Sequence, residues 1–448
     1  MNFFNYVFLI ASLLLCKFSS SAKTFNVLDF GARGDGMTLD TAAIQRTIDA
    51  AAAAGGQVLI PRRHTFLIAT LDLKGGIDFH VAGTLLISTN QRDYATDGVI
   101  TASSAPDLRI TGSGKILGQS LSFMTGYDAT NEWWLFKEFR PKMFVLTGCT
   151  NLVVRDLTFG DAPFWGLHML GCENVLVDNV TVDNRLDVPN DDGIDPDHCR
   201  NVEIKNCHLT CGDDAIVLKS TRQTNDFGDC ANIHVHDCVI RTQDAGLKIG
   251  TETTGDIHDV LFERCKIISS SRGLCIQLRD EGNVFGIAFR NIQFTSRYHS
   301  DPWWGRGEAI SFTAHQRSPG GKLGKLHDIT VENVTGRAEN SVRINGSAAS
   351  RMENIRLKHV AVRLGRWTKY TGSVFDNRPT KVLDPVEIHA TDGFNVRFAD
   401  QVSLEGCSVS WAEDCPEDFR DSVRAENVTA LKVAEFKGDS ARHPRVVQ

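Results

Sequence analysis

The sequence has 448 residues, of which 42% are hydrophobic and 23% are charged, and its formal net charge is -7. This composition supplies enough apolar side chains for a folded core. The negative charge argues against nucleic acid as a partner, and it would repel an acidic polymer unless the fold gathers cations locally.

The N-terminus has the pattern of a secretory signal. An apolar run over residues 3–16 is too short to span a bilayer. The small residues Ser20 and Ala22 suit a cleavage site after Ala22, although no Lys or Arg precedes the run. We predict a signal peptide over 1–22 and a secreted protein, extracellular or periplasmic. No later stretch is apolar enough to cross a membrane, so we expect no membrane partner.

One stretch predicts a helix. Residues 40–54 are rich in alanine, and Ile44 and Ile48 fall on one face of a helical pattern. Gly55 and Gly56 end the pattern. We expect this helix to cover an exposed apolar end of the fold.

The middle of the chain contains an internal repeat. A pattern of Asn, alternating aliphatic residues, a polar bend and a second apolar run recurs over residues 150–159, 173–182, 200–209 and 231–240. Most intervals are roughly 23 to 31 residues, and short strands with period-two alternation fill them. This predicts an all-β fold, a right-handed parallel β-helix (solenoid) with an N-terminal capping helix. We expect a single domain over 23–448, and a monomer.

Two residue types recur at fixed places in the repeat. Cys149, Cys172 and Cys199 share one position, which favours cysteines stacked in a core. Asparagines at the bends are expected to form ladders. The sequence contains no CxxC pair, so we expect no zinc site, and no metal or other cofactor.

Two acidic runs lie one repeat apart. The first includes Asp192 and Asp195, and the second includes Asp213 and Asp214. Stacked repeats would bring these carboxylates together, as acid/base cleavage of a glycosidic bond requires. A simpler interpretation is that Asp-Gly and Gly-Asp-Asp are turns, but two such runs one repeat apart favour a site.

Several motifs resemble one known family. The opening Phe25-Asn-Val-Leu-Asp-Phe-Gly-Ala-Arg-Gly-Asp-Gly36 and the helix after it look like the start of pectin-degrading β-helix enzymes. Asn190-Asp-Asp-Gly-Ile-Asp195, Gly212-Asp-Asp214 and Ala162-Pro-Phe-Trp-Gly-Leu-His168 resemble glycoside hydrolase family 28, which contains polygalacturonases and rhamnogalacturonan hydrolases. The resemblance implies inverting hydrolysis of α-glycosidic bonds to galacturonic acid in pectic polysaccharide, without a metal.

The resemblance also implies roles for individual residues. The family's Asn-Thr-Asp motif falls on Asn190, Asp191 and Asp192, with Asp in place of Thr, and Asp192 becomes a water-activating base. The paired acids fall on Asp213, implied as the general acid, and Asp214, implied as a second base. We expect Asp195 to orient a neighbouring side chain.

Two family motifs are missing. The segment 243–250 has no histidine where polygalacturonases carry Gly-His-Gly, and Cys275-Ile-Gln277 replaces their Arg-Ile-Lys. A Cys/Gln pair cannot grip a substrate carboxylate as Arg and Lys do. Three explanations remain open. The sugar beyond the scissile bond is neutral, or Arg279 and Lys248 replace the missing cations, or activity is lost. Lys219 is a further candidate at the border of the site.

Two aromatic segments are candidate walls of a sugar-binding cleft. Residues 298–308 contain Trp303 and Trp304, which could stack on a sugar, and Arg306, which could bind an acid group. The alternative is that one tryptophan anchors the loop. Residues 131–137 are a similar insertion. For His168 we favour a structural role over a place in the cleft.

Two other function classes remain. A pectate-lyase-like eliminase would share the fold and release unsaturated products, but the placement of the Asp residues argues against it. A non-catalytic carbohydrate-binding β-helix would share the repeat and the aromatic loops without needing the Asp cluster.

Overall fold

The computed structural model describes residues 23–441, so the predicted signal peptide lies outside the described residues. The chain divides into two compact units. The first comprises the residues up to Gly212 together with Asn232–His234, and the second comprises Asp213–Ala231 and the residues from Val235 onward. The single domain expected over 23–448 stays a prediction.

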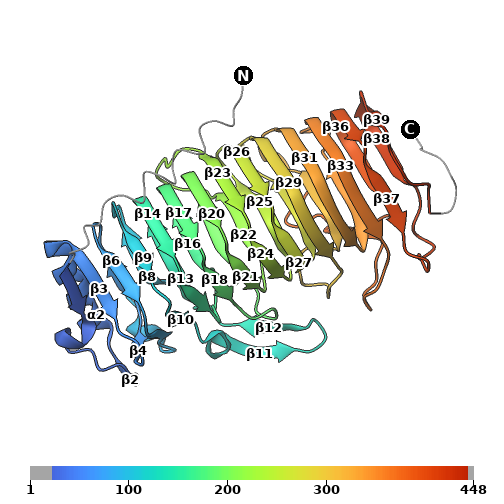
Figure 1. The fold of residues 1–448 in the computed structure, drawn as a ribbon. Helices are drawn as coiled ribbons and strands as arrows, with labels where there is room; N and C mark the ends of the chain where they lie inside the picture. Colours follow the sequence, from blue (N-terminus) through green and yellow to red (C-terminus); the bar gives the residue numbers. More distant parts are fainter. Residues whose placement is uncertain (1–22, 442–448) are drawn as a thin grey trace. The chain divides into compact units, whose positions relative to one another are not determined.

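The first unit contains the helices and the strands up to β21 (Figure 1). In chain order its elements are β1 (Lys23–Asn26), η3 (Val27–Phe30), β2 (Asp35–Leu39), α2 (Thr41–Ala54), β3 (Gly56–Ile60), β4 (Thr65–Ile68), β5 (Leu71–Leu73), β6 (Asp78–Val81), β7 (Thr84–Ile87), η4 (Gln91–Asp93), β8 (Gly98–Ser103), β9 (Arg109–Thr111), β10 (Lys115–Leu117), η5 (Ser120–Phe123), β11 (Met124–Asp128), β12 (Trp133–Phe136), β13 (Lys142–Thr147), β14 (Thr150–Arg155), β15 (Thr158–Gly160), β16 (Leu167–Leu170), β17 (Glu173–Asp178), β18 (Thr181–Asp183), β19 (Ile194–Asp197), β20 (Arg200–Lys205) and β21 (His208–Cys211).

The second unit consists of longer strands joined by loops, and β23 contributes residues to both units. Its elements are β22 (Ile216–Ser220), β23 (Cys230–His236), β24 (Val239–Thr242), β25 (Ala245–Thr253), β26 (Ile257–Glu263), β27 (Lys266–Ser270), β28 (Arg272–Leu278), β29 (Val284–Ser296), β30 (Glu308–Ala314), β31 (Leu326–Ala338), β32 (Asn340–Asn345), β33 (Met352–Leu364), β34 (Val374–Asp376), β35 (Val386–Ile388), β36 (Phe394–Glu405), β37 (Ser408–Trp411), β38 (Val423–Thr429) and β39 (Lys432–Ala434).

The helix α2 confirms the predicted helix. It begins at Thr41 and ends at Ala54, and its buried side chains include Ile44 and Ile48. It packs against β1, β3 and β5 of the first unit. The 3.6-residue period therefore identified the buried face correctly.

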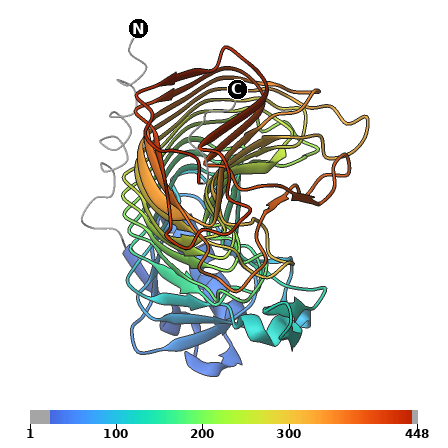
Figure 2. The same cartoon turned by 90° about the vertical axis from the view of Figure 1, so that its right-hand side faces the viewer.

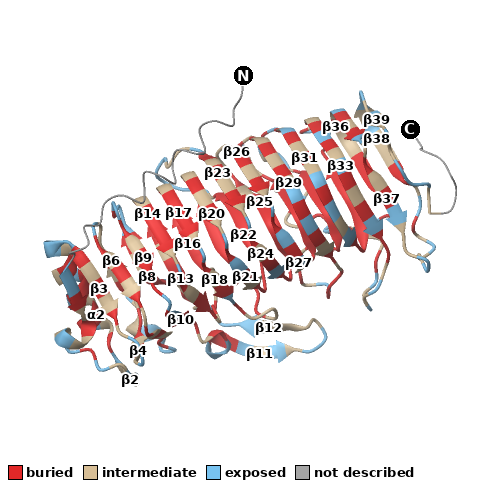
Figure 3. Ribbon diagram, in the orientation of Figure 1, coloured by how far each residue is buried: buried red, intermediate tan, exposed pale blue. Residues whose placement is uncertain are grey.

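Strands one repeat apart pair in parallel in the first unit. Strand β14 pairs with β17, and β17 pairs with β20, so that Leu152, Val175 and Val202 follow one another in register. All three side chains are buried. The period-two alternation predicted from the repeat is visible as buried and less buried bands along the strands of each unit (Figure 3). Cys149, Cys172 and Cys199 are buried as predicted.

The predicted asparagine ladder is present at one bend. Asn174 donates to Asn151 over 3.2 Å, Asn201 donates to Asn174 over 3.0 Å, and Asn232 donates to Asn201 over 2.7 Å. Each of the four has a positive φ of 55–56°, a left-handed conformation that Asn adopts more readily than most residues. The ladder therefore pairs side-chain amides at bends that a branched residue would strain.

The second unit has an aromatic and aliphatic core. Phe289 lies between Phe262, with ring centroids 4.9 Å apart, and Phe312, with centroids 5.7 Å apart. Strands β25, β28, β30 and β32 pair in parallel, which places Leu247, Leu274 and Ile310 in register on the core side.

One hairpin departs from the parallel pattern. Strands β11 and β12 pair antiparallel and contain the predicted aromatic insertion. The hairpin projects from the strands of its own unit (Figures 1 and 2) and is partly exposed. Within residues 23–441, no helix has the length and apolar character needed to cross a bilayer.

Candidate functional site

The first acidic motif forms a buried turn before β19 in the first unit. Asn190 has φ 63°, in the left-handed region. Asp192 is 2% exposed, and Asp195, on β19, is fully buried. Asp192 accepts a hydrogen bond on its backbone oxygen from the Gly166 amide at 2.9 Å. The turn interpretation and the site interpretation are compatible here, because a rigid turn can hold a carboxylate in place.

Asp191 supports this turn. It is fully buried, and its Oδ1 accepts a hydrogen bond from the Gly212 amide at 2.6 Å. Its backbone oxygen accepts a bond from Asn184 Nδ2 at 2.8 Å. The residue that replaces the expected Thr therefore ties the first motif to the residue immediately before Asp213 in the chain.

Sequence reasoning missed Arg140, which also fixes the first motif. Its guanidinium donates to the Pro189 oxygen at 2.8 Å and to Asn190 Oδ1 at 2.9 Å. It lies 3.9 Å from the ring centroid of Phe136 and 4.6 Å from that of Phe164. Arg140 thus joins the aromatic hairpin to the left-handed Asn190. The only sequence signal was a cation shortly after an aromatic run.

His168 has the structural role that we favoured. Its Nε2 lies 3.1 Å from Asp197 Oδ2, and both side chains are buried. On the neighbouring strand, Asp195 is its register partner. Asp195 therefore lies beside a paired histidine, which fits an orienting role.

The second acidic motif lies just before β22 in the second unit. Asp213 is 5% exposed and Asp214 is 2% exposed. The Asp214 amide donates to Asp213 Oδ1 over 2.9 Å, and the Ala245 amide lies 3.4 Å from Asp214 Oδ1. Two neighbouring carboxylates are thus held in nearly dry surroundings, where like charges disfavour simultaneous ionisation.

Lys248 is bonded to this acidic pair. Its Nζ lies 2.6 Å from Asp214 Oδ2 and 3.6 Å from Asp244 Oδ2. Burial alone would lower the pKa of Lys248, but the two carboxylates outweigh it and raise this pKa above its ordinary value. We had expected Lys248 to replace a missing substrate cation, yet its ammonium is directed to Asp214.

Lys219 lies on β22 and is 4% exposed. Its Nζ is 3.8 Å from a carboxylate oxygen of Glu252. Burial works to raise the pKa of Glu252, but Lys219 and Lys248 together lower it below its ordinary value. The predicted place of Lys219 beside a substrate stays a prediction.

We call the side of strands β25, β28, β30 and β32 opposite the core the outer face. The outer face carries Lys248, Cys275, Gln277, Ser311, Thr313 and Arg343, and all six side chains are buried. Gln277 Nε2 donates to the Arg378 oxygen over 3.1 Å, and its Oε1 lies 3.4 Å from Arg272 Nη1. Gln277 therefore holds another segment of the protein.

The predicted role of Arg279 as a substitute cation does not fit its position. Arg279 is fully buried, and its Nη1 donates to the backbone oxygens of Leu278 and Thr313. Burial lowers the pKa of Arg279 to about 9, and nearby arginines, including Arg343, act in the same direction. Strand alternation placed Arg279 near Gln277 but could not show that the chain covers it.

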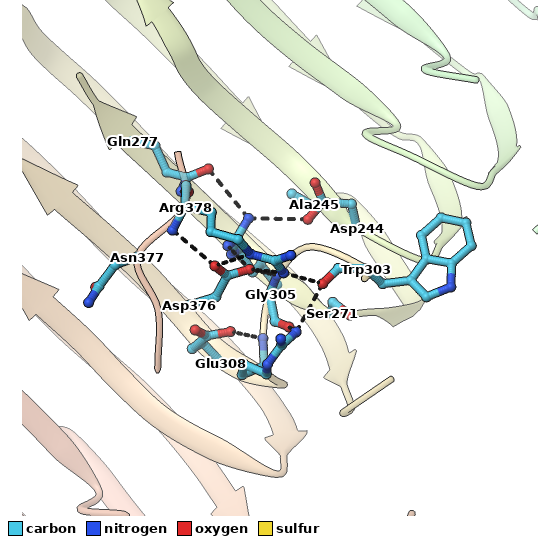
Figure 4. A network of polar contacts seen from close by, with 12 residues as sticks. Asp244, Ala245, Ser271, Gln277, Trp303, Gly305, Glu308, Asp376, Asn377 and Arg378 are labelled. Carbon is cyan, nitrogen blue, oxygen red and sulfur yellow. Dashed lines mark hydrogen bonds and ion pairs between the residues drawn. The ribbon is translucent and has the colours of Figure 1, made fainter. Parts of the chain in front are cut away.

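A buried charge network covers part of the outer face (Figure 4). Arg272 lies 3.3 Å from Asp244 and 3.3 Å from Asp376, and Asp376 lies 2.8 Å from Arg378. Burial alone would raise the pKa of Asp376, but the Arg378 bonds and the Arg272 charge hold this pKa well below its usual range. No sequence pattern predicted a role for Asp244, Arg272, Asp376 or Arg378. Asp244 and Arg272 lie about one hundred residues or more before Asp376 and Arg378, so no local pattern connects the two pairs.

The aromatic loop is anchored by one of its two tryptophans, and sugar stacking by the other stays a prediction. Trp303 is 1% exposed, so it anchors the loop and does not offer a stacking face. Trp304 is less buried, and the guanidinium of Arg378 lies 4.7 Å from its ring centroid. Arg306 is 2% exposed and donates to the backbone oxygens of Trp303 and Gly305. We predicted that Arg306 binds an acid group of the substrate, but its guanidinium instead donates hydrogen bonds to the loop's own backbone.

The second unit thus offers an acid pair with unequal surroundings. Asp214 lies 2.6 Å from the Lys248 ammonium, whereas Asp213 accepts a hydrogen bond from the backbone amide of Asp214. An opposite charge favours an ionised carboxylate. The arrangement can keep one carboxylate charged while the other carries a proton. The Lys248 ammonium lies between Asp214, at 2.6 Å, and Asp244, at 3.6 Å.

Sequence comparison supports the resemblance. Residues 51–381 match the model of glycosyl hydrolases family 28. A probable polygalacturonase of Arabidopsis thaliana is 28% identical over 301 residues, which cover 64% of this chain and 61% of the relative, so the chain spans about three fifths of that relative. An exopolygalacturonase of Zea mays is 25% identical over 363 residues, covering 70% of this chain and 85% of the relative.

Structural comparison supports the fold. A hyperthermoactive exopolygalacturonase from Thermotoga maritima superposes with a TM-score of 0.69 at 20% sequence identity, over 90% of this chain and 95% of that chain. This similarity and the parallel pairing within each unit confirm the predicted right-handed parallel β-helix fold. Because the family model matches well over half of the sequence, the chain belongs to glycosyl hydrolases family 28.

Proposed function

We propose that the protein is an inverting glycoside hydrolase that cleaves α-glycosidic bonds to galacturonic acid in pectic polysaccharide. The observation that carries this proposal is the buried pair Asp213 and Asp214, in which Asp214 is bonded to Lys248 at 2.6 Å. Membership of a hydrolase family and the names of the relatives, polygalacturonase and exopolygalacturonase, support the substrate class.

The proposed reaction uses three carboxyl groups. Asp213 donates its proton to the glycosidic oxygen as the bond from that oxygen to the anomeric carbon breaks. A water molecule attacks the same carbon from the opposite side and gives a proton to Asp192 or Asp214. The oxygen of this water becomes the new hydroxyl, so the configuration at the anomeric carbon inverts. The base then releases its proton to solvent, and Asp213 takes up a proton from solvent, so that both groups return to their starting states.

The turn that carries Asp192 is stiffly supported within the first unit. The Gly212 amide, one residue before Asp213, donates to Asp191, one residue before Asp192. Arg140 and Asp191 both stabilise the turn that carries Asp192. Stiff support of this kind suits carboxylates that must hold a water molecule in position.

Galacturonan is the first candidate substrate because the named relatives are polygalacturonases. A specific observation favours rhamnogalacturonan as the second candidate. Cys275 and Gln277 stand where the family carries Arg and Lys, and the cations Arg272 and Arg378 beside them are paired with Asp376. A neutral rhamnose beyond the scissile bond would need no cation there.

We further propose that the protein is secreted, acts as a monomer and needs no cofactor. The apolar N-terminal run and the small residues Ser20 and Ala22 support export. A polysaccharide substrate of this kind is a large polymer outside cells, which is consistent with an extracellular location.

The test is to incubate the wild-type protein separately with polygalacturonan and rhamnogalacturonan and to identify both product ends. We expect saturated ends and an inverted anomeric configuration by NMR. Asp213→Asn should lower turnover by about 10²–10⁴-fold, the usual contribution of a general acid. Asp259→Asn is the matched control, because Asp259 is exposed in the same unit.

Unsaturated product ends would instead establish an eliminase. Binding of either polymer with no product from wild type would support the non-catalytic alternative. Unchanged turnover of Asp213→Asn would contradict the assignment of the acid.

A further inference from the structure

Buried charges in the second unit alternate in sign from the candidate acid pair to a distant segment. Successive nitrogen–oxygen distances are 2.6 Å from Asp214 to Lys248, 3.6 Å from Lys248 to Asp244 and 3.3 Å from Asp244 to Arg272. The series continues over 3.3 Å from Arg272 to Asp376 and 2.8 Å from Asp376 to Arg378. We call these six residues, Asp214, Lys248, Asp244, Arg272, Asp376 and Arg378, the charge chain.

The charge chain is almost completely shielded from water. Five of its six residues are at most 6% exposed, and Arg378 is the exception. A buried charge is tolerated only when opposite charges and hydrogen bonds surround it. Each cation of the chain therefore depends on the acids beside it, and Lys248 depends on Asp214 and Asp244 together.

The distant half of the charge chain is fixed by backbone bonds. The Gly305 amide donates to Asp376 Oδ2 over 2.9 Å, and the Arg378 guanidinium donates to the Pro302 oxygen over 3.2 Å. In Figure 4 the side chains of Asp244, Gln277 and Asp376 come from different segments and point toward one another. Arg272 contacts Asp244, Gln277 and Asp376, and it in turn holds Asp244 next to Lys248.

The geometry points to Lys248 as a positioning residue: it keeps Asp214 ionised and oriented during hydrolysis, while the rest of the charge chain keeps Lys248 in place. This inference rests on the proposed function. It replaces the expectation that Lys248 binds a substrate carboxylate. An ammonium with two buried carboxylate partners has little charge left for a substrate, whereas a charged Asp214 leaves Asp213 as the group that carries the proton.

Other charged or titratable groups also face this site within the second unit. They come from the segments around β22, β25 and β28, and they are Asp213, Lys219, Asp244, Glu252, Arg272 and Cys275. The negative charge of Asp244, which shares Lys248 with Asp214, disfavours ionisation of Asp214 when the ammonium is removed. Without the Lys248 ammonium, Asp214 should therefore take up a proton at higher pH than in the wild type.

The first experiment measures kcat and KM against pH for wild type, Lys248→Met and Lys248→Arg on the pectic substrate that wild type cleaves. We expect Lys248→Met to lower kcat at least tenfold at the wild-type optimum and to move the acidic limb of the kcat profile to higher pH by about one unit or more. KM should change less than threefold. Lys248→Arg should restore the position of the limb. Lys325→Met is the matched control, because Lys325 pairs with Glu353 in an exposed salt bridge of the same unit.

A different result would overturn the inference. If Lys248→Met raises KM tenfold or more and leaves the acidic limb unmoved, Lys248 is a substrate-binding cation. If kcat and its pH profile both match wild type, Lys248 has no positioning role.

A second experiment does not depend on activity. Infrared spectroscopy during a pH titration detects the protonated carboxyl group, whose absorption should appear at higher pH in Lys248→Met than in wild type. The added absorption should disappear in the double variant Lys248→Met/Asp214→Asn. If wild type cleaves neither polymer, the proposed function fails, and this titration still decides whether Lys248 sets the charge of Asp214. An unchanged titration would refute the inference even for an active enzyme.

Discussion

The two sides of strands β25, β28, β30 and β32 are both buried, but for different reasons. The core side carries aliphatic and aromatic residues in register, such as Leu247, Leu274 and Ile310. The outer face carries Lys248, Gln277 and other polar side chains that are equally inaccessible to water. The core side is buried by the strands' own neighbours along the fold, whereas the outer face is buried by segments from elsewhere in the second unit.

This difference predicts different responses to mutation. Removing core atoms leaves a cavity that the surrounding side chains cannot fill. Removing an outer-face charge leaves its partner buried and uncompensated. The first kind of damage depends on volume, and the second depends on charge and hence on pH.

The largest effect on stability is expected in the core. Phe289→Ala should lower the free energy of unfolding by about 3–5 kcal/mol, because Phe289 is fully buried between Phe262 and Phe312. Chemical denaturation monitored by fluorescence measures this change. Phe285→Ala on the same strand is the control, because Phe285 is only partly buried. Equal losses for the two variants would contradict a tightly packed core at Phe289.

A slightly smaller decrease in the free energy of unfolding is expected for a variant in the charge chain. Asp376→Asn keeps the shape of the side chain but leaves Arg272 and Arg378 without its charge, so we expect a loss of about 3 kcal/mol. Asp400→Asn removes a more exposed partner of Arg351 and should cost about 0–1 kcal/mol. The same denaturation experiment compares the two. A loss for Asp376→Asn no larger than that of the control would mean that the outer face is not held together by charge.

The stability of the second unit should also depend on pH through His389, the residue that directly follows β35. This side chain stacks on Phe375 with ring centroids 3.5 Å apart, and burial lowers the pKa of His389 to about 4 from the ordinary 6.5. The unfolded chain therefore takes up a proton near pH 6.5 that the folded protein resists until about pH 4. The contribution of His389 to the free energy of unfolding is fully present above pH 6.5. It falls by about 2–3 kcal/mol as the pH is lowered toward 4.

Thermal unfolding of wild type and His389→Gln between pH 7 and about pH 4 tests this sign. The variant should lose less stability on acidification than wild type. His359→Gln, at an exposed position, should behave like wild type. A His389→Gln variant that follows the wild-type curve would exclude His389 as the source of the pH dependence.

The smallest effect is expected at the asparagine ladder of the first unit. Asn174→Gly keeps the left-handed backbone accessible and removes one ladder bond, so it should cost about 1 kcal/mol. Asn174→Ala should cost more, because alanine also resists the φ of 56°. Thermal unfolding measures both. An alanine variant as stable as the glycine variant would show that backbone conformation does not matter at this bend.

The sequence by itself determined the repeat, the strands and the capping helix. The alternation of Leu152, Val154 and their counterparts, and the spacing of Ile44 and Ile48, depend only on which side chains must leave water. The Asn-Asp-Asp and Gly-Asp-Asp motifs also identified the family, because they are short and local.

Only the tertiary structure decided what the outer-face residues do. Alternation placed Lys248, Gln277 and Arg279 on one side of their strands, but it could not show that other segments cover that side. Asp376 and Arg378 lie about one hundred residues beyond Gln277 in the chain, as the Gln277–Arg378 hydrogen bond with its separation of 101 residues shows. A charge pairs with whatever the fold brings within a few ångströms of it, and no local pattern in the sequence records that partner.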